Sequence, residues 1–132
     1  MASGRLRGAL VYDAGALLAA ERGDPEMIAL HAEVNAAGIQ PIVPVVALAQ
    51  AWRGGPQHRI SWLLKGCEVL PDDERLGRAA GVACASSRTV DVVDALVVAM
   101  ALRHNAAVVT SDPADLRRVA DAVGIKLALF VV

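Results

Sequence analysis

The chain has 132 residues, of which 55% are hydrophobic and 3% aromatic, and its formal net charge is −1. This length suits a single domain spanning residues 1–132, and a core of Val, Leu, Ile and Ala favours layered α/β packing over an aromatic-rich β sandwich. The near-zero charge excludes the strong basic field of many constitutive nucleic-acid binders, and no apolar run is long enough to span a bilayer.

The first half of the chain reads as two strands, each followed by a pair of helices. In chain order these are a strand at 8–12, helices at 14–22 and 25–37, a strand at 39–43, and helices at 44–53 and 57–65. Asp24 is a suitable N-cap with Pro25 at the first helical position, and Gly38 ends that helix. Leu17 and Leu18 are expected to face inward from the first helix.

The second half continues the alternation of strands and helices. We expect a strand at 67–70, a helix through residue 85 capped by Asp72 or Asp73, a polar break at 86–89, a central apolar helix at 90–104, a strand at 106–110, a helix at 113–123 and a last strand at 126–131. This alternation is typical of βαβ units. The predicted fold class is therefore a three-layer α/β domain with a mainly parallel central sheet flanked by helices.

Four aspartates stand where apolar runs break. Asp13 and Asp112 each follow a predicted strand, so both reach the ligand crevice at the sheet edge if those strands are neighbours. Asp91 and Asp94 are three residues apart and can project from one face of a helix start. Gathered acids repel one another in a cleft, and such a cluster usually holds a divalent metal. Oxygen-only ligands favour Mg²⁺ or Mn²⁺.

Helix capping is a competing interpretation of the same acids, because Asp is a favoured N-cap residue. Asp13 can cap the helix after the first strand, and Asp91 with Asp94 resembles a capping pair. Asp112, followed by a proline and then by Asp115, resembles a helix start. Each acid taken singly fits a cap as well as a ligand. The combination favours a metal site, because both strand-end acids fall in functional loops.

Four motifs carry a family resemblance that spans nearly the whole chain. They are Val11-Tyr12-Asp13, the segment PVVALAQAWRG at 44–54, Asp94-Ala95-Leu96-Val97-Val98-Ala99, and Thr110-Ser111-Asp112-Pro113-Ala114-Asp115-Leu116. Together they resemble the PIN-domain ribonucleases, and most of all the VapC-type toxins of bacterial toxin–antitoxin pairs. The resemblance implies that Asp13, Asp94 and Asp112 hold Mg²⁺ or Mn²⁺, with Asp91 and Asp115 as second-tier acids.

The sequence departs from that family at one acid, a helix glutamate whose place falls at Gln50. A glutamine amide can accept a hydrogen bond from a metal-bound water or ligate weakly, but it adds no negative charge. Asp91 can supply the missing charge.

The resemblance implies a metal-dependent endoribonuclease with Asp13, Asp94 and Asp112 as its catalytic acids. It further implies the role of toxin in a type II toxin–antitoxin pair, with RNA as substrate, a cognate antitoxin as partner, a homodimer, and the cytoplasm as location. One alternative is a catalytically weak PIN-like module that binds RNA or protein, with Gln50 marking lost metal affinity. A phosphatase or receiver domain with Asp13 as nucleophile is a further alternative, but Gly15 stands where the phosphatase needs a second acid.

Basic and aromatic side chains give weaker signals. Arg53, Arg59 and Lys65 can form a modest local patch for RNA phosphates, although solvated helix faces explain them equally well. Trp52 and Trp62 are interpreted as core or interface anchors, because no basic-aromatic stripe surrounds them.

The histidines and cysteines show no metal-ligand spacing. His31, His58 and His104 are expected at the surface or at helix ends. Cys67 and Cys84 lie in apolar or Ala-rich settings and are expected to be buried free thiols of a reducing cytoplasm.

Overall fold

Residues 8–89 and 91–132 are described by the structure, which is a computed structural model. Its elements are, in chain order, β1 (Leu10–Tyr12), α2 (Ala14–Glu21), α3 (Pro25–Ala36), β2 (Ile42–Pro44), α4 (Val45–Ala51), α5 (His58–Leu64), β3 (Glu68–Leu70), α6 (Glu74–Ser87), α7 (Val92–Arg103), β4 (Ala107–Thr110), α8 (Pro113–Ala122) and β5 (Leu129–Val131).

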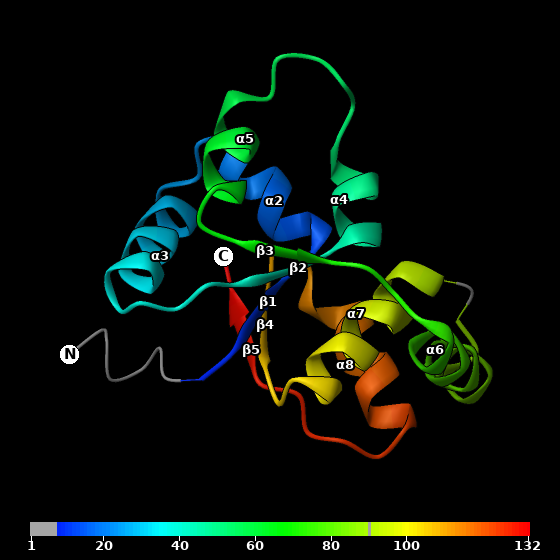
Figure 1. Ribbon diagram of the computed structural model, residues 1–132. Coiled ribbons are helices and arrows are strands. Elements are labelled where there is room, and N and C mark those ends of the chain that lie inside the picture. The colour runs from blue at the N-terminus through cyan, green and yellow to red at the C-terminus, as the bar shows by residue number, and fades with distance from the viewer. Residues whose placement is uncertain (1–7, 90) are drawn as a thin grey trace.

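The strands form one parallel sheet in the order β3-β2-β1-β4-β5. Figure 1 shows α2, α3 and α5 on one side of this sheet and α6, α7 and α8 on the other. The predicted α/β fold class is therefore confirmed. The chain leaves β1 toward β2 and leaves β4 toward β5, in opposite directions, so the order reverses between β1 and β4. In open α/β sheets a crevice forms at such a switch point, beyond the carboxyl ends of the strands.

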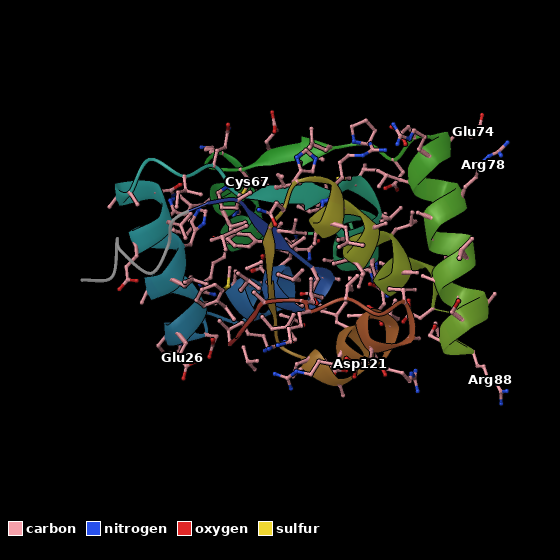
Figure 2. All side chains as sticks on the ribbon, turned by 90° about the horizontal axis from the view of Figure 1, so that it is seen from below. Glu26, Cys67, Glu74, Arg78, Arg88 and Asp121 are labelled. Atoms are coloured by element: carbon pink, nitrogen blue, oxygen red, sulfur yellow. The ribbon has the colours of Figure 1, made fainter. Side chains whose placement is uncertain are left out.

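The core lies around β1, β4 and α7. All three residues of β1 are buried, and so is every residue of α7 from Ala95 to Ala101. A helix that is apolar all round must be covered on every side, and α7 contacts α6, α8 and strands of the sheet. In Figure 2, Arg78 projects from the outer side of α6 and Arg88 from its C-terminal end. Cys67, by contrast, is buried.

Several predicted helix boundaries differ from the structure, and two of the differences have a local chemical reason. Pro44 ends β2 and does not open the next helix, because its ψ of 135° is extended and places it at the N-cap of α4. The helix predicted to stop at residue 85 continues through Ser87, whose hydroxyl donates to the carbonyl of Ala83 at 2.7 Å. It ends where Arg88 adopts the left-handed conformation, with φ of 56°.

All five strands begin later than predicted, and β3 and β4 do so by one residue, at Glu68 and Ala107. β1 begins at Leu10, and Gly8 before it has φ of +89°. β2 begins at Ile42 and β5 at Leu129. The predicted start of the central helix, Val90, lies outside the described residues, and α7 begins at Val92.

Several predicted side-chain positions need correction. Leu17 is fully buried, but Leu18 is 39% exposed. Trp52 and Trp62 are exposed and do not belong to the core. His31 was expected at the surface or at a helix end but is buried. Its Nδ1 lies 2.9 Å from the Tyr12 hydroxyl and its Nε2 lies 3.0 Å from the Asn35 side-chain amide, both within hydrogen-bond distance.

Both cysteines are free, as predicted, although Cys84 is only half-buried. Among the helices of the described residues, none combines the length and the apolar character needed to cross a membrane.

Candidate active site

Two of the predicted acids lie at the switch point because their strands are paired. Tyr12 of β1 is in register with Val109 of β4, and the next amide, that of Asp13, donates to the Val109 carbonyl at 3.2 Å. Asp13 thus leaves β1 beside the end of β4, and Asp112 lies two residues after Thr110, the last residue of β4. The fold brings these two strand ends to the same edge of the sheet.

A cleft of about 340 Å³ opens at this edge. Its polar lining consists of Asp13, Asp91, Asp94, Asp112, Asp115, Gln50 and Arg53. Asp91 and Asp94 come from the start of α7, Asp115 from the first turn of α8, and Gln50 from the end of α4. The apolar lining includes Leu18, Val93 and Val97. All five aspartates singled out in the sequence therefore border one cavity.

Asp13 is the most enclosed of these acids, with 7% of its surface exposed. Its Oδ1 accepts from the amide of Ala16 at 2.8 Å, so the side chain also caps α2. Burial raises the pKa of the Asp13 carboxyl, and the charge of Asp112 adds to that rise, whereas the Thr110 hydroxyl and the amides at the start of α2 oppose it.

Space beside Asp13 is tight. A Cβ built on Gly15 would lie 2.5 Å from the Ser111 hydroxyl oxygen and 3.3 Å from Oδ1 of Asp13. Ser111 therefore occupies the volume that a side chain at residue 15 would need. The sequence alone did not predict that Gly15 lies against Ser111. A glycine two residues after a strand-end acid was the available signal.

Asp91 and Asp94 divide their roles at the start of α7. Oδ1 of Asp91 accepts from the amide of Asp94 at 3.1 Å, so Asp91 is the helix cap. Burial raises the pKa of Asp94 to about 7, with further contributions from Asp91, Asp115 and Asp13. Asp94 thus carries most of the electrostatic cost of the gathered charges, because three other acids act on it.

The prediction that the Asp112 side chain caps a helix is wrong. Asp112 occupies the N-cap position of α8, but its carboxylate makes no capping hydrogen bond. Its amide instead donates to the Thr110 hydroxyl at 3.0 Å, and the side chain is exposed. The carboxylate is consequently free for other ligands. Asp115 forms an exposed ion pair with Arg118 at 3.3 Å.

Of the three basic residues proposed from the sequence, only Arg53 lines the cleft. Arg59 donates to the carbonyl of Glu21, at the end of α2 opposite Asp13. Because α2 has eight residues and is roughly 12 Å long, Arg59 lies about one helix length away from Asp13. Lys65 follows α5, is exposed, and does not line the cleft.

The donor set fits a hard divalent cation in its chemistry. Carboxylate and amide oxygens are the ligands that Mg²⁺ and Mn²⁺ prefer. Burial, and after it the charges of neighbouring acids, raise the pKa of Asp94, and a bound cation would offset those charges. Within residues 8–89 and 91–132, no three acidic, histidine or cysteine side chains converge closely enough to enclose an ion. The acids border one cleft without meeting at one point.

Comparisons with known proteins agree with this architecture. The sequence pattern that defines the PIN domain matches residues 10–122. The fold is similar to the crystal structure of VapBC2 from Rickettsia felis bound to a promoter DNA fragment, with a TM-score of 0.70, 14% identity, and coverage of 94% of this chain and 98% of that one.

Two further solved structures share the fold. A toxin–antitoxin complex from Klebsiella pneumoniae has a TM-score of 0.66 at 14% identity, covering 80% of this chain and 88% of that one. FitAcB from Neisseria gonorrhoeae has a TM-score of 0.65 at 13% identity, with 92% and 96% covered. No curated protein matches the sequence closely enough to count as a relative.

Proposed function

The chain belongs to the PIN domain family, whose members are generally nucleases, and from this premise we propose that it is a divalent-metal-dependent endoribonuclease. The observation that carries the proposal is the single cleft bordered by five aspartates at the switch point of the sheet. Asp13, Asp94 and Asp112 are the proposed metal ligands and catalytic acids, with Asp91 and Asp115 in support. No serine or cysteine nucleophile is required.

The proposed ligands differ in how free their oxygens are. Asp13 uses Oδ1 to cap α2 and Asp91 uses Oδ1 to cap α7. The Thr110 hydroxyl also bonds the Asp13 carboxylate, so Asp13 has fewer free acceptor sites than Asp112. Asp112 has both oxygens available, because its side chain makes no cap. When bound here, Mg²⁺ or Mn²⁺ supplies Lewis-acid chemistry: it favours loss of a proton from water and offsets charge on the scissile phosphate.

Arg53 is the proposed first contact for RNA, since it brings a positive charge to the same cleft. Arg59 and Lys65 are proposed only as contacts for RNA that extends beyond the cleft. We propose the cytoplasm as the location of the protein, because an RNA substrate is present there.

We extend the proposal to the role of toxin in a type II toxin–antitoxin pair, acting as a homodimer with a cognate antitoxin. Support comes from the fold shared with VapBC2 and FitAcB and with the Klebsiella pneumoniae toxin–antitoxin complex. Co-expression with the gene product encoded next to this chain, followed by size-exclusion chromatography, tests both partnerships. A monomer that no neighbouring product binds would contradict this part of the proposal.

The activity is tested by incubating the purified protein with a labelled RNA and with DNA of the same sequence. We expect RNA cleavage in Mn²⁺ or Mg²⁺ and none in EDTA. Asp112→Asn should abolish cleavage without loss of folding, because the Asp112 side chain does not cap α8. Cleavage at the wild-type rate by both Asp112→Asn and Asp13→Asn would contradict the assignment.

One observation favours a second candidate function. Gln50 borders the cleft without the negative charge of the family's acid, which suits a PIN-like module that binds RNA or protein but cuts weakly. RNA binding without cleavage in any divalent metal would support this candidate over the first.

A further inference from the structure

Gln57 ties together the two ends of the turn that joins α4 to α5. Its Oε1 accepts from the amide of Arg53 at 2.7 Å, and its Nε2 donates to the carbonyl of Ala51 at 3.0 Å. The turn between Arg53 and Gln57 contains Gly54, with φ of +80°. A glycine turn has more conformational freedom to lose than any other, so one amide that bridges it restricts the position of Arg53.

Arg53 leaves this turn with its charge uncompensated. Its Nη1 donates to the carbonyl of Trp52 at 2.8 Å and is 3.4 Å from that of Ala49, at the end of α4 where a helix favours a cation. The described residues show no further hydrogen bond from its Nη2 or Nε, and none of their ion pairs includes Arg53. By contrast, Arg103 uses both Nη atoms on Asp73.

A guanidinium with two free nitrogens recognises an oxyanion through paired hydrogen bonds. Arg53 lines the cleft with the aspartates, yet none of them neutralises it. An anion that enters beside the acids would therefore meet Arg53 as a ready donor. For an RNA substrate, that anion is a backbone phosphate.

We propose that Gln57 is a positioning residue, which holds Arg53 at the cleft so that Arg53 binds a backbone phosphate of the RNA. This inference rests on the proposed ribonuclease function. Its physical basis is preorganisation: with the turn fixed beforehand, less conformational freedom is lost when RNA binds. Within the described residues, the side-chain hydrogen bonds of Gln57 go to backbone atoms, those of Arg53 and of Ala51 at the end of α4.

The test compares Gln57→Ala, Arg53→Gln and the double variant in Mn²⁺-dependent cleavage of a single-stranded RNA at several salt concentrations. Gln57→Ala should raise KM on the order of fivefold, the ratio for one ordinary hydrogen bond, and leave kcat nearly unchanged. Arg53→Gln should also flatten the dependence of log KM on log salt by about 0.7, because one single-strand phosphate contact is lost. Gln57→Ala should shift that slope in the same direction.

The double variant should resemble Arg53→Gln alone, because Gln57 acts through Arg53. Gln40→Ala is the matched control: Gln40 also bonds a backbone carbonyl, that of Cys67, but lies away from the cleft. It should leave KM and the salt slope unchanged. If Gln57→Ala does not fold, Gln57→Asn replaces it, since the shorter side chain cannot span both ends of the turn.

Additive losses in the double variant would overturn the inference, as would an unchanged KM in Gln57→Ala or Gln57→Asn. Those outcomes leave the nuclease proposal intact if the wild type cuts RNA. A wild type that neither binds nor cuts RNA would overturn both proposals together.

Discussion

Two acidic regions of this molecule treat their carboxylates in opposite ways. Asp73, at the start of α6, caps that helix through the amide of Leu76 and pairs with both Nη atoms of Arg103. These contacts lower the pKa of Asp73 to about 2, chiefly through the hydrogen bonds with Arg103. In the cleft, burial and neighbouring acids raise the pKa of Asp94 to about 7. One region uses its acid to hold the structure together, whereas the other accumulates charge at the expense of stability.

A functional acid in this protein can be told from a structural one by the partners of its carboxylate. Both regions contain an N-cap aspartate, Asp73 and Asp91, so capping alone does not distinguish them. What distinguishes them is compensation. Asp73 has a bidentate arginine, but no ion pair among the described residues reaches Asp13, Asp91, Asp94 or Asp112. Uncompensated charge in a cleft is typical of a site that awaits a cation.

The largest expected effect is on catalysis. Asp94→Asn should lower the rate of RNA cleavage by at least about a hundredfold, because it removes an electrostatic element of the site. Asp73→Asn should leave the rate unchanged, because Asp73 lies outside the cleft lining. Single-turnover kinetics measure both. Equal losses in the two variants would erase the distinction between the regions.

The response to metal should be the next largest effect. At a free Mn²⁺ concentration 100 times the Kd, the free energy of unfolding should rise by about 2.7 kcal/mol, because the ion binds only the native state. Asp94→Asn should reduce this gain and also raise the Tm of the metal-free protein, since one repelling charge is gone. Thermal unfolding with and without Mn²⁺ measures both effects, with Asp73→Asn as the variant that keeps the full metal response.

The dependence of stability on pH should separate the regions by sign. The native pKa of Asp94, about 7, lies above its ordinary value of 3.8. Its contribution is therefore fully present below about pH 4 and is lost as pH rises toward 7 in EDTA. The native pKa of Asp73, about 2, lies below that value. Its contribution is present above about pH 4 and is lost as pH falls toward 2.

Urea unfolding across this pH range checks the prediction. Asp94→Asn should flatten the decline between pH 4 and 7, and Asp73→Asn should flatten the acid limb. The effect at Asp73 should be the smaller one and should shrink in salt, because its pair with Arg103 is solvent-exposed. A decline toward neutral pH that Asp94→Asn leaves unaltered would contradict the assigned source of the charge repulsion.

The smallest expected effect concerns Gln50, the neutral member of the cleft. Gln50→Glu should raise Mn²⁺ affinity by about tenfold and slightly lower metal-free stability, because it adds an anionic ligand beside existing acids. Isothermal titration of Mn²⁺ into both proteins measures this. Equal affinities would exclude Gln50 from the metal site.

Much of this organisation could be predicted from the sequence, because apolar runs and strand-end acids follow directly from local pattern. That pattern predicted that Asp13 and Asp112 meet at one edge if their strands are neighbours, and β1 does pair with β4. It could not tell which of Asp91 and Asp94 is the cap, because both spacings fit a helix start. It also could not place Arg59, whose guanidinium is held by the carbonyl of Glu21, a partner distant in sequence.

The two hydrogen bonds of Gln57 could not be predicted from the sequence for a different reason. These hydrogen bonds close a turn in which Gly54 has φ of +80°, a conformation that two successive glycines permit but do not require. Likewise, the sequence predicted that Asp112 caps α8, and the observed cap geometry lacks the side-chain bond. Turn dihedrals of this kind are set by tertiary packing.

The contact between Gly15 and Ser111 makes two distant positions interdependent during mutation. A side chain introduced at residue 15 would collide with the Ser111 hydroxyl oxygen, 2.5 Å from its Cβ, and would press on Asp13 as well. Gly15→Ala should therefore be tolerated better after Ser111→Gly than before it, so the order in which the two changes occur matters. In related chains, a larger residue at the first position should accompany a smaller or displaced one at the second.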